Sequence, residues 1–173
     1  YWNVPLLRNE KTIERPADQR TITSRYTDEA VAFIRGHRDR PFLVYLPHSL
    51  PHVPLFASEP FQGTSARGLY GDVVEEIDAG VGRILATLKE LGLDENTLVW
   101  FFSDNGGLNQ SASPPGLVAV LERLVSIFGT PLPTEMLEFV RENTFEGASD
   151  NAPLRGGKTT VYEGGVRVPS ILR

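Results

Sequence analysis

Three short clusters in the sequence carry residue types that suit chemistry on an anionic ligand. They contain His52, the adjacent pair Asp104 and Asn105, and Lys158. The first two clusters follow apolar runs that resemble strands, and the third lies in a Gly-rich turn. Ligands of open α/β sheets bind beyond the carboxyl ends of the strands. We therefore expect the three loops to converge at one edge of a sheet.

Asp104 and Asn105 could bind a cation. A carboxylate and an amide oxygen are ligands that hard cations such as Ca²⁺ or Mg²⁺ accept, although calcium takes six or more oxygens. Two adjacent residues supply only part of such a shell. The run Asp104-Asn-Gly-Gly107 is also good turn chemistry, because Asn and Gly tolerate positive φ. On spacing alone the turn is the stronger interpretation.

His52 and Lys158 could contact an anion. His52 lies between prolines on a loop, where it could donate a hydrogen bond or act as a general acid, or simply face solvent. Lys158 follows two glycines that let the backbone approach an anion closely. Its ammonium group suits phosphate or sulfate oxygens. The sequence around it is not a Walker motif, and a solvated turn explains it equally well.

Composition excludes several other functions. The chain has no cysteine, which excludes disulfides, zinc thiolate sites and cysteine nucleophiles. A net charge of -5 gives no electrostatic footprint for nucleic acid. No apolar run reaches the roughly 18 residues that a membrane span needs. The acidic residues Asp72, Glu75, Glu76 and Asp78 are expected on the solvated face of a helix.

The elements that would position these clusters alternate between helix and strand. A helix is expected from about Thr23, with Thr27 as a candidate cap. A second, over residues 69–91, ends at Gly92 in a left-handed cap. Apolar runs at 41–47 and 97–103 predict buried strands. This order favours an α/β fold with a mostly parallel sheet.

The region from Leu108 to Asn151 interrupts this alternation. Apolar spacing predicts one amphipathic helix from Leu117 to Phe128 and another around Met136 to Val140. We interpret residues 108–151 as an inserted helical hairpin rather than a new domain. A further strand is expected from Val166 to Leu172.

The combination of clusters resembles the type I sulfatases of the alkaline phosphatase superfamily, nearest to arylsulfatase and N-acetylgalactosamine-6-sulfatase. The resemblance rests on three stretches in the family's order: PFLVYLPHSLPHVPLFAS, GLYGDVVEEIDAGVGRILATLKELGLDENTLVWFFSDNGG and APLRGGKTTVYEGGVRVPSILR. It implies that residues 1–173 are a single partial catalytic domain with the fold of a partial three-layer sandwich. It also implies that Asp104 and Asn105 are calcium ligands, with Mg²⁺ as the alternative ion. His52 and Lys158 would bind the sulfate, and His52 would protonate the leaving oxygen.

The family's nucleophile is a formylglycine made within a Cys/Ser-x-Pro-x-Arg motif, and this chain contains no such motif. We therefore expect a central fragment that lacks the nucleophile segment and the smaller C-terminal domain, and that is inactive alone. Glu163 and Arg167 match framework positions. The implied substrate is a small-molecule sulfate ester, a glycan or a glycolipid, and the implied location is secreted, periplasmic or lysosomal.

Two other functions stay open. A phosphodiesterase or phosphonate monoester hydrolase of the same superfamily shares the metal site and can share the nucleophile. A non-catalytic pseudoenzyme remnant would bind a metal, an anion or a partner through the same fold.

Overall fold

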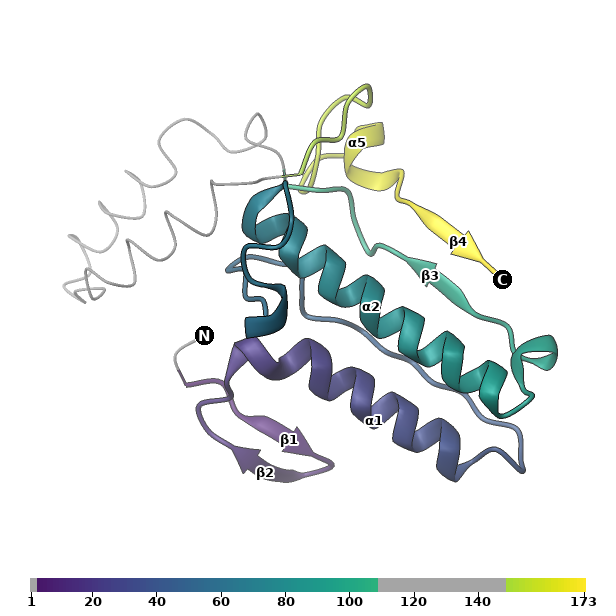
Figure 1. Ribbon diagram of the computed structural model, residues 1–173. Helices are drawn as coiled ribbons and strands as arrows, with labels where there is room; N and C mark the ends of the chain where they lie inside the picture. Colours follow the sequence, from purple (N-terminus) through teal and green to yellow (C-terminus); the bar gives the residue numbers. More distant parts are fainter. Residues whose placement is uncertain (1–2, 109–148) are drawn as a thin grey trace. The chain divides into compact units, whose positions relative to one another are not determined.

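The computed structural model describes residues 3–108 and 149–173, which fall into two compact units. The first comprises Tyr1–Pro51 and Phe56–Glu95, and the second comprises His52–Leu55 and Asn96–Arg173. Figure 1 shows the elements of each unit. The predicted hairpin helices of the insertion lie outside the described residues, and the single-domain assignment stays a prediction.

Two long helices form the core of the first unit. They are α1, Ile22–Gly36, and α2, Gly68–Glu90, and they pack side by side (Figure 1). Their shared core includes Ile34, Val73 and Leu88, each with 2% or less of its surface exposed. Burial of such side chains contributes roughly 1.5–3 kcal/mol each. The helix pair is therefore the main apolar stabilisation of this unit.

The predicted cap at Thr27 is wrong. Helix α1 begins earlier because the chain enters it through a 3-10 turn, Gln19–Thr21, whose cap Asp18 accepts a hydrogen bond from Arg20 N. Thr27 instead lies inside α1, fully buried, and its hydroxyl donates to Thr23 O at 3.0 Å. It faces α2 where a Cβ at Gly80 would overlap the hydroxyl, so a glycine permits the close helix contact.

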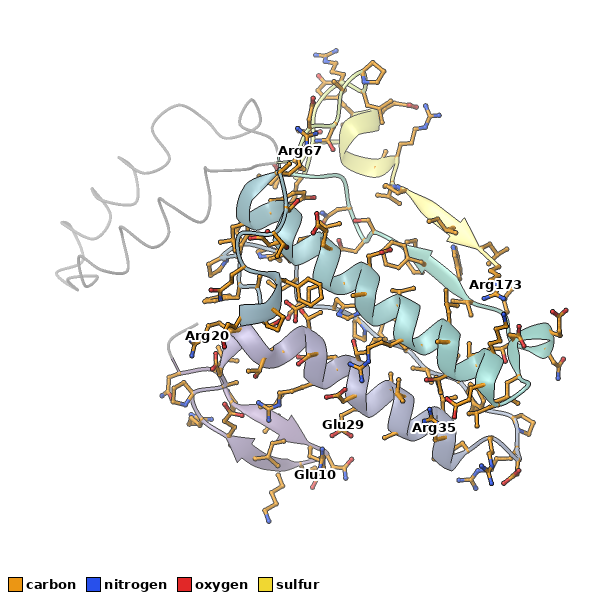
Figure 2. The ribbon with its side chains drawn as sticks, in the orientation of Figure 1. Glu10, Arg20, Glu29, Arg35, Arg67 and Arg173 are labelled. Carbon is orange, nitrogen blue, oxygen red and sulfur yellow. The ribbon has the colours of Figure 1, made fainter. Side chains whose placement is uncertain are left out.

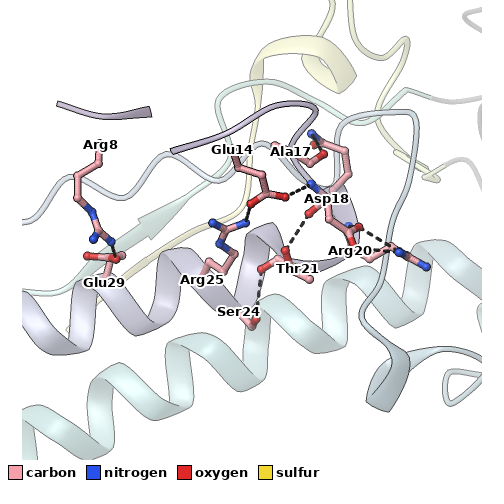
Figure 3. A network of polar contacts seen from close by, with 10 residues as sticks. Arg8, Glu14, Ala17, Asp18, Arg20, Thr21, Ser24, Arg25 and Glu29 are labelled. Carbon is pink, nitrogen blue, oxygen red and sulfur yellow. Dashed lines mark hydrogen bonds and ion pairs between the residues drawn. The ribbon is translucent and has the colours of Figure 1, made fainter. Parts of the chain in front are cut away.

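A β-hairpin precedes α1. Strands β1, Leu6–Arg8, and β2, Lys11–Glu14, pair antiparallel. Two ion pairs join the hairpin to α1, one between Arg8 and Glu29 and one between Glu14 and Arg25 (Figure 3). The other oxygen of Glu14 accepts from Asp18 N at 2.9 Å. Glu14 thereby fixes both the hairpin and the entry to the helix.

The chain after α1 is extended but pairs with no strand among the described residues. Exposure alternates from 41 to 49, which is the period of a β-strand. The outward side chains include Leu43, 86% exposed, and Tyr45, 80% exposed. The predicted buried strand at 41–47 is therefore wrong for the described residues, because the segment forms no ladder and its alternate side chains are exposed.

Helix α2 buries two of the four acidic residues that were expected on its solvated face. Asp72 and Glu76 are 2% and 4% exposed. The Asp72 carboxylate accepts from Gly63 N and Ser65 N, both at 2.8 Å, and Glu76 Oε2 accepts from Ser58 N at 2.8 Å. Backbone donors of the loop before α2 replace water at Asp72 and at Glu76 Oε2, whereas Glu76 Oε1 is buried without a hydrogen-bond partner among the described residues.

The far end of α2 forms the predicted left-handed cap. Gly92 has φ +68°, its N–H donates to Lys89 O at 3.1 Å, and Leu93 N donates to Leu88 O at 2.9 Å. This is the bond pattern of a Schellman motif. Nearby, Arg35, near the end of α1 in Figure 2, donates to both carboxylate oxygens of Glu90.

The second unit contains a small antiparallel sheet. Strand β3, Trp100–Phe102, pairs with β4, Ser170–Leu172, in the register Trp100 to Leu172. A one-turn helix, α5, Glu163–Val166, precedes β4. Both predicted strands exist, but α5 occupies the start of the second one. The predicted parallel pairing and burial are not seen among the described residues, where β3 is exposed and both ladders are antiparallel.

Candidate functional site

All four residues singled out by the sequence belong to the second unit. His52 lies in the segment His52–Leu55, which clusters with Asn96–Arg173 although its neighbours in sequence belong to the first unit. Asp104 and Asn105 follow β3, and Lys158 precedes α5. Strand β3 and the loops around α5 therefore position three of the four.

The turn after β3 presents the two predicted metal ligands. Ser103 Oγ donates to Asn105 O at 2.8 Å, which closes the turn around Asp104. The side chain of Asp104 is exposed, and that of Asn105 is half-buried. Asn105 Nδ2 donates to Gly106 O at 3.0 Å. That bond uses the amide nitrogen, so the amide oxygen remains available as a ligand.

These two oxygens suit a hard cation but do not form a complete site. A carboxylate and an amide oxygen are ligands that calcium and magnesium take. No group of three or more His, Asp or Glu side chains that could hold a metal occurs in residues 3–108 and 149–173. The donor set therefore fits part of a metal shell.

Lys158 sits in a tight turn of unusual backbone geometry. Thr160 N donates to Gly157 O at 3.1 Å, which makes Lys158 and Thr159 the two central residues. Thr159 has φ +76°, a left-handed conformation that a β-branched residue rarely adopts. The Thr160 hydroxyl also donates to Gly157 O at 2.8 Å. The turn thus holds Lys158 in a fixed, locally strained backbone.

This turn is bonded directly to the turn that carries Asp104. Lys158 N donates to Gly107 O at 3.0 Å, and Gly106 N donates to Gly165 O at 2.9 Å. Gly107 is three residues beyond Asp104, a length of chain that spans at most about 11 Å. The structure therefore brings the predicted cation loop and the predicted lysine loop together.

Glycines make this approach possible. A Cβ at Gly106 would overlap the carbonyl of Gly164, and one at Gly164 would overlap the carbonyl of Gly156. Gly106 and Gly164 are both buried. The SDNGG, RGG and EGG runs are therefore the contact surfaces of backbone segments that pack against one another with no side chain between them.

The hydrogen bond of the His52 side chain is local. Pro51 and Pro54 flank the residue, its side chain is exposed, and its Nδ1 lies 2.6 Å from Val53 O. Within the described part of the chain, no hydrogen bond joins His52 to Asp104, Asn105 or Lys158. The convergence of His52 with the other two loops stays a prediction.

One residue of the candidate site escaped the sequence reasoning. The side chain of Asn151 bonds both backbone groups of Gly107 and also reaches Gly156 O. In the sequence it is one of several turn-forming residues before a proline, and nothing marks a partner 44 positions away.

The framework pair Glu163 and Arg167 forms an exposed ion pair at 3.2 Å, one helical turn apart.

Comparisons with known proteins identify the family. The sequence model described as Sulfatase matches residues 2–173. Mouse steryl-sulfatase is 39% identical over 171 residues, which cover 99% of this chain and 23% of the relative. Mouse N-acetylgalactosamine-6-sulfatase is 35% identical over 180 residues, which cover 98% of this chain and 28% of the relative. The chain thus spans about a quarter of the length of these curated relatives.

Solved structures are also similar to this chain. Ps i-CgsB, crystallised with k-i-k-neocarrahexaose, superposes with a TM-score of 0.68 at 29% identity over 98% of this chain and 31% of its own. The PsFucS1 sulfatase from Pseudoalteromonas sp. gives a TM-score of 0.65 at 27% identity over 92% of this chain and 27% of its own. These neighbours confirm the α/β, alkaline-phosphatase-like class. Among the described residues, no helix is long and apolar enough to cross a membrane. With its sequence matched almost from end to end, the chain belongs to the sulfatase family.

Proposed function

We propose that this chain forms part of a sulfuric ester hydrolase that acts on sulfate monoesters. The observation that carries the proposal is the bond from Lys158 N to Gly107 O at 3.0 Å. It joins the loop with two oxygen ligands for a cation to the loop with a cationic side chain. An ester sulfate carries negative charge on its free oxygens, and a cation and a cationic side chain within reach of these oxygens would both stabilise it.

Asp104 and Asn105 would hold a divalent cation, with Ca²⁺ as the first candidate and Mg²⁺ as the alternative. When bound, the cation supplies positive charge that polarises the ester oxygens. The exposed carboxylate of Asp104 would contribute charge, and the amide oxygen of Asn105 a neutral ligand. No His or further acidic side chain in residues 3–108 and 149–173 completes a group of three with them, so we expect further ligands from other parts of the protein, from backbone carbonyls or from water.

Lys158 and His52 would act on the ester itself. The Lys158 ammonium would donate to a sulfate oxygen from a backbone held by its turn. His52 Nδ1 lies against its own chain at Val53 O, which leaves Nε2 to face a ligand. A protonated His52 could then donate its Nε2 proton to the leaving oxygen.

The nucleophile is not among these 173 residues. The family's formylglycine arises from a Cys or Ser in a short Pro- and Arg-containing motif, and the chain has neither a cysteine nor a serine in that setting. We expect the isolated chain to show no turnover of 4-nitrophenyl sulfate with calcium or magnesium. Metal-dependent turnover by the 173 residues alone would overturn this assignment.

The decisive experiment uses the longest polypeptide that carries these residues. Its turnover of 4-nitrophenyl sulfate is compared with that of bis(4-nitrophenyl) phosphate. We expect sulfate to be preferred, and Lys158→Ala and Asp104→Asn each to lower kcat/KM by about a hundredfold or more, the range for loss of one charge-stabilising group. Preference for the phosphodiester would favour the related hydrolases instead.

A non-catalytic metal- or anion-binding domain is the second candidate function, and it would be favoured if the longest polypeptide also lacks a Cys/Ser-x-Pro-x-Arg segment. If the longest polypeptide binds calcium through Asp104 yet turns over neither ester, this candidate replaces the first. The names of the relatives favour a sulfated steroid or a sulfated sugar as substrate for the hydrolase.

A further inference from the structure

The side chain of Asn151 uses all its hydrogen-bonding groups on two separate loops. Its Oδ1 accepts from Gly107 N at 3.0 Å. Its Nδ2 donates to Gly107 O at 2.8 Å and, more weakly, to Gly156 O at 3.4 Å. A carboxamide has two donor hydrogens and an oxygen with two lone pairs, so both donors and one of the two acceptor positions are used.

The first two bonds reproduce what a neighbouring strand would supply. In an antiparallel ladder, a residue gives its N–H and takes an N–H from one partner residue. Asn151 offers Gly107 the same pair of bonds from a side chain. Gly107 lies directly after the turn of Asp104 and Asn105, so its orientation sets where that turn ends.

The third bond reaches the loop of Lys158. Gly156 lies two residues before Lys158, and its own carbonyl packs against Gly164. The Gly107 carbonyl receives Lys158 N as well as Asn151 Nδ2. One carbonyl is thus the meeting point of the cation loop, the lysine loop and the asparagine.

We propose that Asn151 is a positioning residue that fixes the Lys158 loop relative to the Asp104–Asn105 loop. Its value for catalysis rests on the function proposed above, but its role in joining the loops does not. The other direct links, Lys158 N to Gly107 O and Gly106 N to Gly165 O, run between backbone groups. Asn151 supplies the side-chain bonds that hold Gly107 in the orientation those links require.

The chemistry is specific to asparagine. Aspartate keeps the acceptor for Gly107 N but has no hydrogen for either carbonyl, and its charge would face carbonyl oxygens. Alanine removes both kinds of bond. These two substitutions therefore separate the acceptor from the donors.

The test is amide hydrogen exchange on the full chain, followed residue by residue by NMR. We expect Asn151→Ala to speed exchange at both Gly107 and Lys158 by about tenfold, the effect of losing one typical net hydrogen bond. Asn151→Asp should restore some protection at Gly107 and none at Lys158. The matched control is Asp150→Ala, because Asp150 Oδ1 only accepts from Ala152 N at 2.8 Å within its own turn.

Two results would overturn the proposal. If only Gly107 changes in Asn151→Ala, the residue caps one turn and joins nothing. If exchange also rises across β3 and β4, where Val99 N and Arg173 N bond across the ladder, Asn151 is a general structural residue of the unit.

A second readout separates this proposal from the proposed function. Mn²⁺ takes the same oxygen ligands as calcium and magnesium and broadens nearby NMR signals. We expect Mn²⁺ to broaden Asn105 and Lys158 in the unmodified chain, and Lys158 much less than Asn105 in Asn151→Ala. If Mn²⁺ broadens neither signal, the result contradicts the metal site but not the positioning role. Hydrogen exchange then still decides the role of Asn151. Equal broadening in both proteins would count against the positioning role.

Discussion

Different interactions stabilise each of the two units of this chain. In the first, α1 and α2 bury apolar side chains such as Ile34 and Val73, and ion pairs fasten the hairpin to α1. In the second, backbone segments rich in glycine lie in direct contact, and hydrogen bonds of Asn151 join them. The apolar residues of β3 there are largely exposed.

The candidate site therefore lies in the unit whose described residues include fewer buried apolar side chains. A helix pair tolerates modest changes of side chain because its core can relax. Where a glycine lies against a backbone carbonyl, the backbone cannot relax to make room for an added side chain. We therefore expect single added methyl groups to damage the second unit far more than the first, and changes of charge or pH to report mainly on the first.

The largest effect should follow Gly106→Ala. Its Cβ would overlap the backbone of Gly164, which cannot move aside as a flexible side chain could. We expect a loss of about 3 kcal/mol or more in the unit that holds Asp104. Hydrogen exchange at β3 and β4 measures it. The matched control is Gly82→Ala in α2, where nothing lies within 4 Å and a gain of about 0.5–1 kcal/mol is expected. Equal behaviour of the two variants would break the comparison.

Asp72→Asn should cost the first unit about 2–3 kcal/mol in urea unfolding, since charged acceptors of buried N–H groups contribute about that much. Burial alone would raise the pKa of Asp72, but the N–H donors of Ser65 and Gly63 outweigh it and hold the pKa below its ordinary 3.8. This stability is therefore present above about that pH and lost as the pH falls below it. Asp78→Asn, exposed on the same helix, is the control and should change little.

His48 should make the first unit sensitive to mild acid. Burial lowers the pKa of His48 from its ordinary 6.5, and its Nδ1 is buried without a partner among the described residues. The unfolded chain then takes up a proton before the folded chain does. Stability is complete above 6.5 and falls as the pH drops towards the lowered pKa. Urea unfolding should show this slope, and His48→Gln should flatten it. An unchanged slope would remove His48 as the cause.

The smallest effect is expected from Thr159→Gly. Thr159 has φ +76°, and a left-handed conformation costs a residue with a Cβ about 1–2 kcal/mol. Glycine relieves this cost but loses more chain entropy on folding, so the net gain should be about 0.5 kcal/mol. Thermal unfolding followed at the second unit measures it. A loss of stability would mean that the threonine side chain contributes more than its backbone costs.

Periodic features of the fold were predictable from the sequence. Apolar spacing located α2 to within one residue at each end, and Gly92 identified its cap. The turns after β3 and before α5 were recognisable because Asn and Gly dominate them. Local chemistry determines features of this kind, and local chemistry is what a single sequence displays.

Features that depend on distant partners were not predictable. Asp72 and Glu76 appear as polar residues of a surface helix, and only the loop that donates to them explains their burial. The antiparallel pairing of β3 with β4 joins segments 70 residues apart, as the bond from Trp100 Nε1 to Ser170 Oγ illustrates. Asn151 was missed for the same reason.

The ends of the long segment between the two candidate loops meet at one point. Ser149 Oγ donates to Leu108 O at 3.3 Å, directly beside the bonds between Gly107 and Asn151. Two residues that are 41 positions apart in the sequence are therefore neighbours in space. Because this contact fixes both ends, a change in the length of the sequence between them need not move Asp104 or Lys158.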